Sequence, residues 1–465
     1  MKARRILAEQ LPPRLMDMVA SAEREAWRAR ADFGWDPGTG RAAPNASQSP
    51  RDPRSVSVVL AKGGKSLFHW LQDPRVTVTS PGERSTTAPD IVVTTEPYDL
   101  IRDPASQQLP DEAWARLRTG EARLLIDSSG EGYPFDAGIF LKMREAMRAQ
   151  GVERTDYVYV TQDRRYPKAS QAHRRSHPDE PEVTVLVHDR YIQYLLSMVG
   201  GQGRKAFRRR VLDYAAAPAQ RGRRFISLNN KFRPARLLFL LALLRDGLWD
   251  QGHISVGPFD QFAGHELSLK QVWKKTFAVR ELRPLSRELL AGLDQLTTLA
   301  PQYVGLDGAV PTKGGDRMMV VPNRFAEYAD SWFTVVTETD FSDRLHRITE
   351  KPFKPLLCLH PFIVLGSRGS LRLIRDYGFK TFPSLFDEGY DEERDPLARF
   401  EAVYEQVGRL CRMDEAELAR ASDDAAEAMV FNAWWGLAEL PALFRERIDA
   451  VLVDRLIGLA HGPAN

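Results

Sequence analysis

The sequence gathers amide and cationic side chains at one point, in the stretch SLNNKFRPAR. This stretch follows an apolar run typical of a strand and precedes an apolar run typical of a helix. Asn229 and Asn230 can hydrogen-bond a ligand, and three cations follow within six positions: Lys231, Arg233 and Arg236. In open parallel sheets, ligands bind where strands end, and a helix N-terminus favours anions. We therefore expect a phosphate site here; the alternative is a helix start with solvated basic residues.

A second polar stretch, TETDFSDRLHRITEKPF, follows another predicted strand. Glu338 ends that strand, and Thr349, Glu350 and Lys351 lie where we predict a helix to begin. We expect Thr349 to cap this helix. Glu350 can then accept hydrogen bonds from ribose hydroxyls, and Lys351 can neutralise a phosphate. The alternative is a capping residue beside an exposed ion pair.

Two further loops follow predicted strands. In LLIDSSGEGYPFD, Glu131 is the candidate general base, because a carboxylate facing an acceptor can remove a proton from its hydroxyl. The alternative for this loop, which also contains Asp127 and Asp136, is a simple polar turn. The turn GSRGS at 366–370 joins a strand to a helix, but its glycines lack the spacing of a dinucleotide-binding fingerprint.

Several kinds of site are absent from the sequence. GGKS at 63–66 is not a P-loop, because the required first glycine would stand where Val59 is. The chain has no G-x-S-x-G nucleophile elbow, and TETD at 337–340 has the wrong spacing for a metal-binding carboxylate pair. His346 and His360 lack the spacing of metal ligands and are expected to be packing residues. We therefore predict a site with no metal and no cofactor.

Strand-like and helix-like patterns alternate along most of the chain, which predicts an α/β protein with parallel sheets covered on both faces. A first series of strands is predicted within 55–61, 90–96, 122–132, 156–163 and 183–189. A second series is predicted within 223–230, 253–257, 332–338, 361–367 and 380–382, with a stretch of helical character at 341–357.

These two series predict two Rossmann-like domains that face a cleft. An N-terminal helix is expected before them, because Leu15, Val19, Ala22 and Ala26 recur at helical spacing. The predicted parts are an N-terminal helix with a flexible linker (1–55), a first α/β domain (56–215), a second α/β domain (216–395) and C-terminal helices (396–465).

Composition argues against some classes of function. The 465 residues include 65 Lys and Arg and 62 Asp and Glu, and a net charge of +3 argues against a dedicated DNA-binding protein. Basic runs at 204–210 and 221–224 indicate a solvated helix face and a linker, with phosphate contact as the alternative. The two cysteines, Cys358 and Cys411, are expected to be buried thiols in a reducing compartment.

The N-terminus lacks a signal-peptide pattern, and no apolar run is long enough to span a bilayer. The longest run, LLFLLALL at 237–244, lies between two arginines and is expected to be a buried helix. We therefore predict a cytoplasmic protein, with peripheral contact to a membrane as an additional expectation.

The segment ITEKPFKPLLCLHPFIVLGSRGSLRLIRDYGFKTF resembles the donor-binding region of GT-B-type glycosyltransferases, especially the fucosyltransferase-like and exostosin-like groups. In those proteins a [ST]-E-K-x-[FY]-[KR]-x-L stretch precedes a P-[FV]-[IV]-[IVL]-x-G strand. FISLNNKFRPARLLFLLALLRDG is similar to their earlier strand, loop and helix, and to uncharacterised bacterial and phage proteins carrying SLN-[RN]-x-x-R-x-x-R. The resemblance covers residues 223–390 and departs from the family at 358–360, where A-x-G-x-P is usual.

The resemblance implies that Arg236, with Arg233, contacts the donor diphosphate. It implies that Lys351 faces the same charge and that Glu350 contacts the donor ribose or sugar. The first domain would then bind the acceptor. Glu131 would be the base, because its loop is similar in position to a Gly-Glu loop of the fucosyltransferases. The expected donor-binding set is Asn229, Asn230, Arg233, Arg236, Glu338, Thr349, Glu350 and Lys351.

The expected reaction is an inverting, metal-independent transfer, in which cations stabilise the leaving diphosphate. The expected partners are a nucleotide-sugar donor and a glycan, lipid-linked, protein or small-molecule acceptor, and no nucleic acid. Two other functions fit the same residues. A protein of this shape can hold a nucleotide sugar or glycan without turnover, and a nucleic-acid-associated protein can use the basic run at 204–224.

Overall fold

The computed structural model of the chain contains two compact units. The six-stranded unit comprises Arg30–Ser197, Arg344–Arg347 and Pro441–Asn465, and the four-stranded unit comprises Met1–Ala29, Met198–Asp343 and Ile348–Leu440. The structure describes residues 11–43, 51–63, 66–81, 83, 87–95, 97–130, 133–154, 156–199, 203–217, 220–229, 231–257, 260–261, 265–300 and 326–462. The helices that follow residue 395 are divided between the two units.

A parallel sheet with the strand order β4-β3-β5-β6-β7-β8 forms the centre of the six-stranded unit. Its strands are β3 (Val56–Leu60), β4 (Val76–Thr79), β5 (Ile91–Thr94), β6 (Arg123–Ser128), β7 (Tyr157–Thr161) and β8 (Val183–Val187). The five strands predicted in this region are confirmed. The edge strand β4 was not predicted, because only the last of its four residues is buried.

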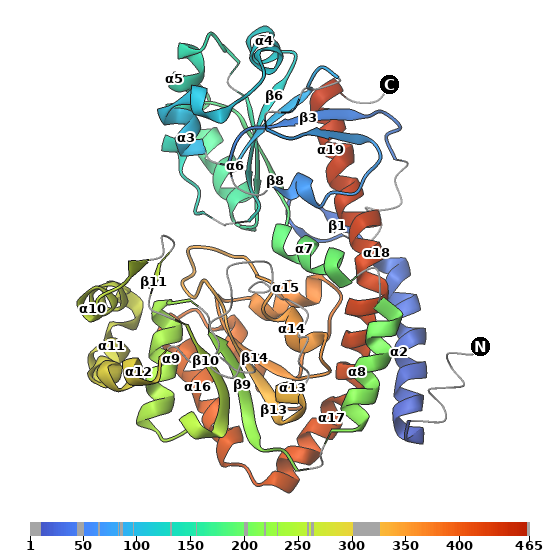
Figure 1. Cartoon of the computed structure of the whole chain (residues 1–465), viewed down its shortest axis with the longest axis vertical. Coiled ribbons are helices and arrows are strands. Elements are labelled where there is room, and N and C mark those ends of the chain that lie inside the picture. The colour runs from blue at the N-terminus through green and yellow to red at the C-terminus, as the bar shows by residue number, and fades with distance from the viewer. Residues whose placement is uncertain are drawn as a thin grey trace. The chain divides into compact units, whose positions relative to one another are not determined.

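Helices cover both faces of this sheet, as the apolar strands predicted. One face packs against α3 (Pro97–Arg102), α4 (Asp111–Thr119), α5 (Ala137–Ala149) and α6 (Tyr166–Ser176). The other face packs against the last helix, α19 (Ala450–His461), which contributes Leu452, Val453, Leu456 and Ile457 to the core. Figure 1 shows α19, in red, on the side of the sheet opposite α3 and α5. The sheet is therefore completed by residues nearly 400 positions after its first strand.

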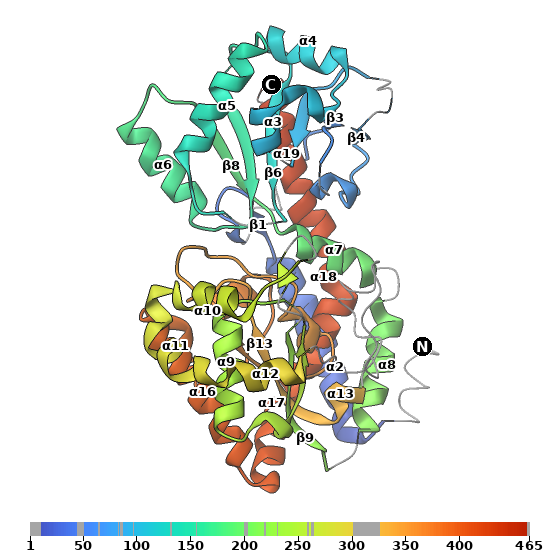
Figure 2. The same cartoon turned by 60° about the vertical axis from the view of Figure 1, so that its left-hand side comes forward.

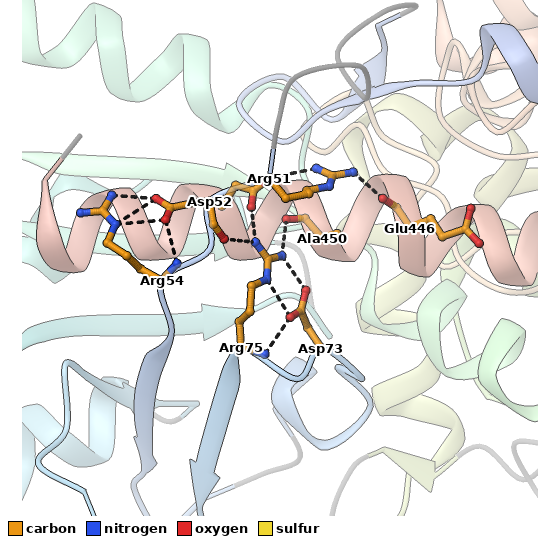
Figure 3. Close-up of polar contacts among 8 residues, drawn as sticks. Arg51, Asp52, Arg54, Asp73, Arg75, Glu446 and Ala450 are labelled. Carbon is orange, nitrogen blue, oxygen red and sulfur yellow. Dashed lines mark hydrogen bonds and ion pairs between the residues drawn. The ribbon is translucent and has the colours of Figure 1, made fainter. Parts of the chain in front are cut away.

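An arginine network ties α19 to the edge of the same sheet (Figure 3). Arg75, which precedes β4, donates to the Asp73 carboxylate (2.6 and 2.9 Å) and to the Asp52 carbonyl (2.8 Å). It also donates to Asp454 and to the Ala450 carbonyl of α19. Burial raises the pKa of Asp73, but the hydrogen bonds and charge of Arg75 outweigh it, so the pKa is lowered.

A second parallel sheet, with the order β10-β9-β13-β14, forms the centre of the four-stranded unit. Its strands are β9 (Arg223–Asn229), β10 (Gly252–Val256), β13 (Ser331–Thr337) and β14 (Phe362–Leu365). All four were predicted. The predicted strand at 380–382 is wrong, because these residues form an irregular segment. The helical stretch predicted at 341–357 is also mostly wrong, since only α14 (Phe353–Leu356) is helical.

The helices of the four-stranded unit include α9 (Pro234–Arg245), which has nine consecutive buried residues. An apolar helix of this kind belongs in a core, and α16 (Pro396–Arg412) packs beside it through a Tyr404–Ala242 hydrogen bond. The amphipathic N-terminal helix is confirmed as α2 (Pro13–Asp32), with Leu15, Val19, Ala22 and Ala26 buried. The other helices here are α8 (Gly203–Ala215), α10 (Leu269–Phe277), α11 (Arg283–Leu289), α12 (Leu293–Leu299), α13 (Ala326–Ala329), α15 (Ser370–Asp376) and α17 (Glu415–Trp434).

Further elements are α7 (Arg190–Val199) and α18 (Leu440–Phe444), and the antiparallel pairs β1 (Trp35–Asp36) with β2 (Arg41–Ala42) and β11 (Asp260–Gln261) with β12 (His265–Glu266). Short 3-10 helices and π-helical turns at Trp435–Glu439 and Arg445–Asp449 connect other elements. Both cysteines are buried free thiols, as predicted, and burial raises each pKa to about 12. None of the described helices combines the length and apolar character needed to cross a bilayer.

Candidate functional site

The order of the strands reverses between β9 and β13 in the four-stranded unit. β9 pairs with β10 on one side and with β13 on the other, so the sheet grows outward in opposite directions from this pair. Ligands of open parallel sheets bind at the carboxyl ends of the strands at such a reversal. Asn229 ends β9 and Thr337 ends β13. The two polar stretches singled out in the sequence therefore meet at one place.

Arg236 joins the ends of these two strands. Its Nε donates to Thr337 Oγ1 (3.0 Å), its Nη2 donates to the Thr337 carbonyl (3.0 Å), and its Nη1 donates to the Lys231 carbonyl. Thr337 Oγ1 donates in turn to Asn229 Oδ1 (2.6 Å). Asn229 and Arg236 are both buried. Their shared role in the structure is thus to fix the geometry of the two strand ends.

Glu338, directly after β13, organises the loop that contains Thr349 and Lys351. Thr349 donates its backbone N–H (3.1 Å) and its hydroxyl (2.7 Å) to the Glu338 carboxylate. Lys351 Nζ donates to Glu338 Oε2 (3.3 Å) and to Thr339 Oγ1 (2.7 Å). These hydrogen bonds offset the cost of burying the charged carboxylate of Glu338. It holds the lysine near the strand ends.

The prediction that Thr349 caps a helix is wrong. The short helix α14 begins after Pro352, and no side chain caps its N-terminus. The Thr349 hydroxyl instead binds Glu338, eleven residues earlier in the chain. A buried carboxylate without donors is costly, so the hydrogen bond of Thr349 to Glu338 is favoured.

Burial and neighbouring cations disfavour the charged forms of two side chains in the site. The pKa of Arg236 is lowered to about 10, because it is buried and because Arg233 is nearby; Glu338 and Glu350 oppose this shift. Burial lowers the pKa of Lys351 to about 8, where Glu338 opposes the shift and Arg236 adds to it. Both side chains are still cationic at neutral pH. A nearby anion would offset both shifts, as Glu338 and Glu350 already do in part.

The N-terminus of α9 opens into a small pocket at the same place. Arg233 occupies the N-cap position, but no side chain caps the helix there. The polar wall of the pocket consists of Asn229, Lys231, Arg233 and Arg236, and the apolar wall of Phe232, Leu237, Leu240 and Val256. Uncapped N–H groups at the start of a twelve-residue helix attract anions. The pocket therefore combines a helix dipole with cationic side chains.

Two predicted site residues, Asn230 and Glu131, lie outside the part of the chain that the structure describes. The two carboxylates near Glu131 have structural partners. Asp127 is buried and accepts hydrogen bonds from the Leu67 N–H (2.7 Å) and the Ser129 N–H (3.0 Å). Asp136 caps α5 by accepting from the Gly138 N–H. Asp127 is therefore a structural residue, and Asp136 has a capping role.

The turn at 366–370 is occupied by groups of the protein itself. The backbone N–H groups of Leu371 and Arg372 donate to the Asp391 carboxylate. Burial raises the pKa of Asp391 to about 6, and these hydrogen bonds oppose the shift. A Cβ added at Gly366 would lie 3.2 Å from Glu338 Cβ, so the chain passes close to the site without room for a side chain. The turn supports the site but does not present a second anion-binding position.

His360 is a buried packing residue, as predicted. Its Nδ1 shares a hydrogen bond with Thr334 Oγ1 (2.7 Å), and its Nε2 bonds the Ser331 carbonyl (2.8 Å). Burial lowers its pKa to about 3, so the imidazole is neutral.

The basic runs at 204–210 and 221–224 also contribute to packing. Phe207 and Arg210 of α8 are buried. Arg221 lies over the Trp332 ring, 4.6 Å from its centroid, and donates to the Ser331 carbonyl. Only part of each run is therefore presented to solvent.

Sequence reasoning missed Thr337, whose hydroxyl and carbonyl both bind Arg236. The sequence does point to Thr337, because it is the last residue of a predicted strand and directly precedes Glu338. What was missing was the strand order that sets β9 beside β13.

Among the described residues, no group of three or more His, Cys, Asp or Glu side chains could hold a metal ion. Comparisons of the chain with models of protein families, with curated proteins and with solved structures found no match. Function is therefore argued from the site itself.

Proposed function

We propose that this chain is a cytoplasmic glycosyltransferase of the GT-B type, in the fucosyltransferase-like or exostosin-like group. In this proposal the four-stranded unit binds a nucleotide-sugar donor, and the acceptor hydroxyl displaces the nucleoside diphosphate with inversion at the anomeric carbon. No metal takes part, because cationic side chains stabilise the leaving group. The acceptor is a glycan, a lipid-linked molecule, a protein or a small molecule. The motif resemblance of residues 223–390 supports this proposal.

The observation that carries the proposal is the group of like charges at the strand reversal. Arg233, Arg236 and Lys351 come from two distant stretches of the chain, and Arg236 disfavours the charge of its neighbour Lys351. The uncapped start of α9 adds its dipole to the same place. A diphosphate is a ligand that compensates all of these groups at once.

Five of the predicted site residues have separate roles in this proposal. Arg236 has five N–H donors, three of which hold Thr337 and the Lys231 carbonyl, and its remaining donors serve the diphosphate. Lys351 neutralises the same charge. Glu350, which is half-buried beside both cations, accepts from ribose or sugar hydroxyls. Glu338 positions Lys351, and Glu131 is the proposed base.

The proposal is tested by thermal shift against a panel of nucleoside diphosphates and nucleotide sugars, since ligands that bind only the native state raise the melting temperature. We expect one nucleotide to give a selective shift. Lys351→Ala should weaken its binding about 10- to 100-fold, the usual effect of losing a charge-assisted hydrogen bond. Lys205→Ala, which removes an exposed lysine of α8, is the matched control and should bind as the wild type does.

The same ligands are then assayed for release of free nucleoside diphosphate. Release that depends on the selected nucleotide sugar supports the enzyme. Selective binding without release from any nucleotide sugar would favour the alternative, a nucleotide-sugar-binding protein without turnover. No shift at millimolar ligand, or an equal loss in both lysine variants, would refute the donor site.

A further inference from the structure

The helix α10, far from the strand reversal in sequence, carries an apolar stripe on its exposed side. Leu269, Trp273 and Phe277 recur every four residues and therefore stack along one face of the helix. Leu269 and Trp273 are 41% and 47% exposed, which is unusual for side chains of this size. The rings of Trp273 and Phe277 stack with centroids 4.8 Å apart. The stripe is thus a continuous apolar ridge.

The stripe adjoins the side of α10 that packs on the protein. The buried residues of the helix, Val272 and Thr276, lie on the same broad apolar face, of which Leu269 and Trp273 form the exposed edge. The following helix, α11, buries Leu285 and Leu289 in the same way. α10, α11 and α12 lie on the outer side of α9 (Figure 2). Leu269 and Trp273 therefore remain at the exposed edge of a helix whose other edge is buried.

The surface around the stripe is strongly basic. The exposed charged residues of 269–287 are six cations and one anion: Lys270, Lys274, Lys275, Arg280, Arg283, Arg287 and Glu281. Lys270 and Lys274 are four residues apart and form a row next to the stripe. Arg283 lies over the Phe277 ring, 5.6 Å from its centroid. The whole chain has a net charge of only +3, so this segment is a local concentration of positive charge.

We propose that α10 and the start of α11 dock on an anionic lipid surface. An amphipathic helix with Trp and Leu on one face and lysines beside them lies in the plane of a bilayer, with its apolar residues at the headgroup level. Each nearby cation is attracted to anionic headgroups. This inference does not depend on the proposed transferase activity, because the stripe and the strand reversal use different residues.

A nucleic acid is the other polyanion that such a surface could meet. The stacking of Trp273 on Phe277, with an interplanar angle of 7°, covers only one face of each ring and does not distinguish the two ligands. One feature favours lipid. Leu269 has no stacking function and is better accommodated by acyl chains.

The test is flotation of the full-length protein with vesicles of phosphatidylcholine alone and with vesicles containing phosphatidylglycerol. We expect binding only to the anionic vesicles, and weaker binding as salt is raised. Trp273→Ala should reduce the partition coefficient about tenfold. The charge reversal Lys270→Glu with Lys274→Glu should reduce it at least as much. Trp27→Ala is the matched control, because Trp27 is 75% exposed on α2, outside this surface.

The outcomes separate the proposal from its rivals. Unchanged binding in Trp27→Ala with loss in both α10 variants supports it. Equal effects of Trp273→Ala and Trp27→Ala, or no binding of the wild type to anionic vesicles, would overturn it. Binding of single-stranded DNA that is lost in the same α10 variants, without vesicle binding, would assign the surface to nucleic acid instead. All variants change exposed side chains, and their melting temperatures verify folding.

Discussion

The ammonium group of Lys351 is oriented by the protein. It has three N–H donors, and two of them bind Glu338 and Thr339. These bonds fix the side chain, so that less entropy is lost when the remaining donor meets a ligand. At the same time, because the pKa of Lys351 is lowered to about 8, the charge on which the proposed donor binding depends is lost within an accessible pH range.

This predicts a pH dependence of nucleotide binding. Lys351 is protonated at pH 7 and loses its proton as the pH rises through about 8, whereas a bound diphosphate favours the protonated form. The dissociation constant should therefore rise above pH 8, by up to about tenfold at pH 9. Titration calorimetry between pH 6.5 and 9.5 measures this, and buffers of different ionisation enthalpy should reveal proton uptake on binding near pH 8.5.

Lys351→Arg is the control for this prediction, because arginine stays charged throughout the range. Its binding should be independent of pH from 7 to 9.5, whatever its absolute affinity. A wild-type profile that is flat over the same range, or an equally steep profile in the arginine variant, would exclude Lys351 as the titrating group.

From residue types alone we predicted which side chains of the four-stranded unit form the site, and this assignment stays a prediction. Cations after a strand indicated an anion site, and Arg236 lies close enough to Lys351 to lower the pKa of the lysine. The partnership of Glu338 with Thr349 was not predictable, because a loop of ten residues separates them. Local rules favoured a helix cap, and only the folded loop supplies the competing acceptor.

The network around Arg75 attaches an element from the end of the chain to an edge strand. Its side chain is only 16% exposed, and its partners Asp73 and Asp454 are also largely covered. We expect Arg75→Met to lower the free energy of unfolding by about 2 kcal/mol, because, among the described residues, Asp73 then keeps only the backbone N–H of residue 75 and Asp454 keeps only Arg51. Urea denaturation measures the loss.

The matched control is Arg102→Met, which breaks an exposed ion pair with Asp99 in the same unit, at 79% and 45% exposure. Exposed pairs contribute little, so this change should stay within about 0.5 kcal/mol. Because Arg75 lowers the pKa of Asp73, the stabilisation by Arg75 depends on pH. The contribution of Arg75 is present above the unfolded-state pKa of Asp, about 4, and should diminish as the pH falls below it. Equal losses in the two variants would contradict the network's role.

At the level of elements, the predictions succeeded where burial leaves a simple pattern. Strands such as β7 and β13 are buried at every position, and they appear in the sequence as continuous apolar runs. β4 lies at the sheet edge and is mostly half-exposed, so its signal was weak. The stretch at 341–357 has helical spacing, yet most of it is irregular. Thr349 and Lys351 of this stretch donate hydrogen bonds to Glu338 instead of forming a helix start.

Across the whole molecule, the assignment of helices to sheets could not be predicted. The helices α16, α17 and α19 all have apolar faces, and periodicity does not say which sheet each one covers. The structure assigns α16 and α17 to the four-stranded unit and α19 to the six-stranded unit. The last residues of the chain therefore complete a core whose strands begin near residue 56.

This arrangement predicts that a truncation after Leu440 affects the two units differently. The deletion removes Leu452, Val453, Leu456 and Ile457, each at most 1% exposed in the core of the six-stranded unit. Burial of each contributes about 1.5–3 kcal/mol, so their sum, about 6–12 kcal/mol, is comparable with the whole stability of a domain. Hydrogen exchange should show rapid exchange of β5, β6 and β7 and continued protection of α9, which serves as the internal control. Protection of both sheets in the truncated chain would mean that α19 is dispensable, and loss of both would mean that the two units fold as one.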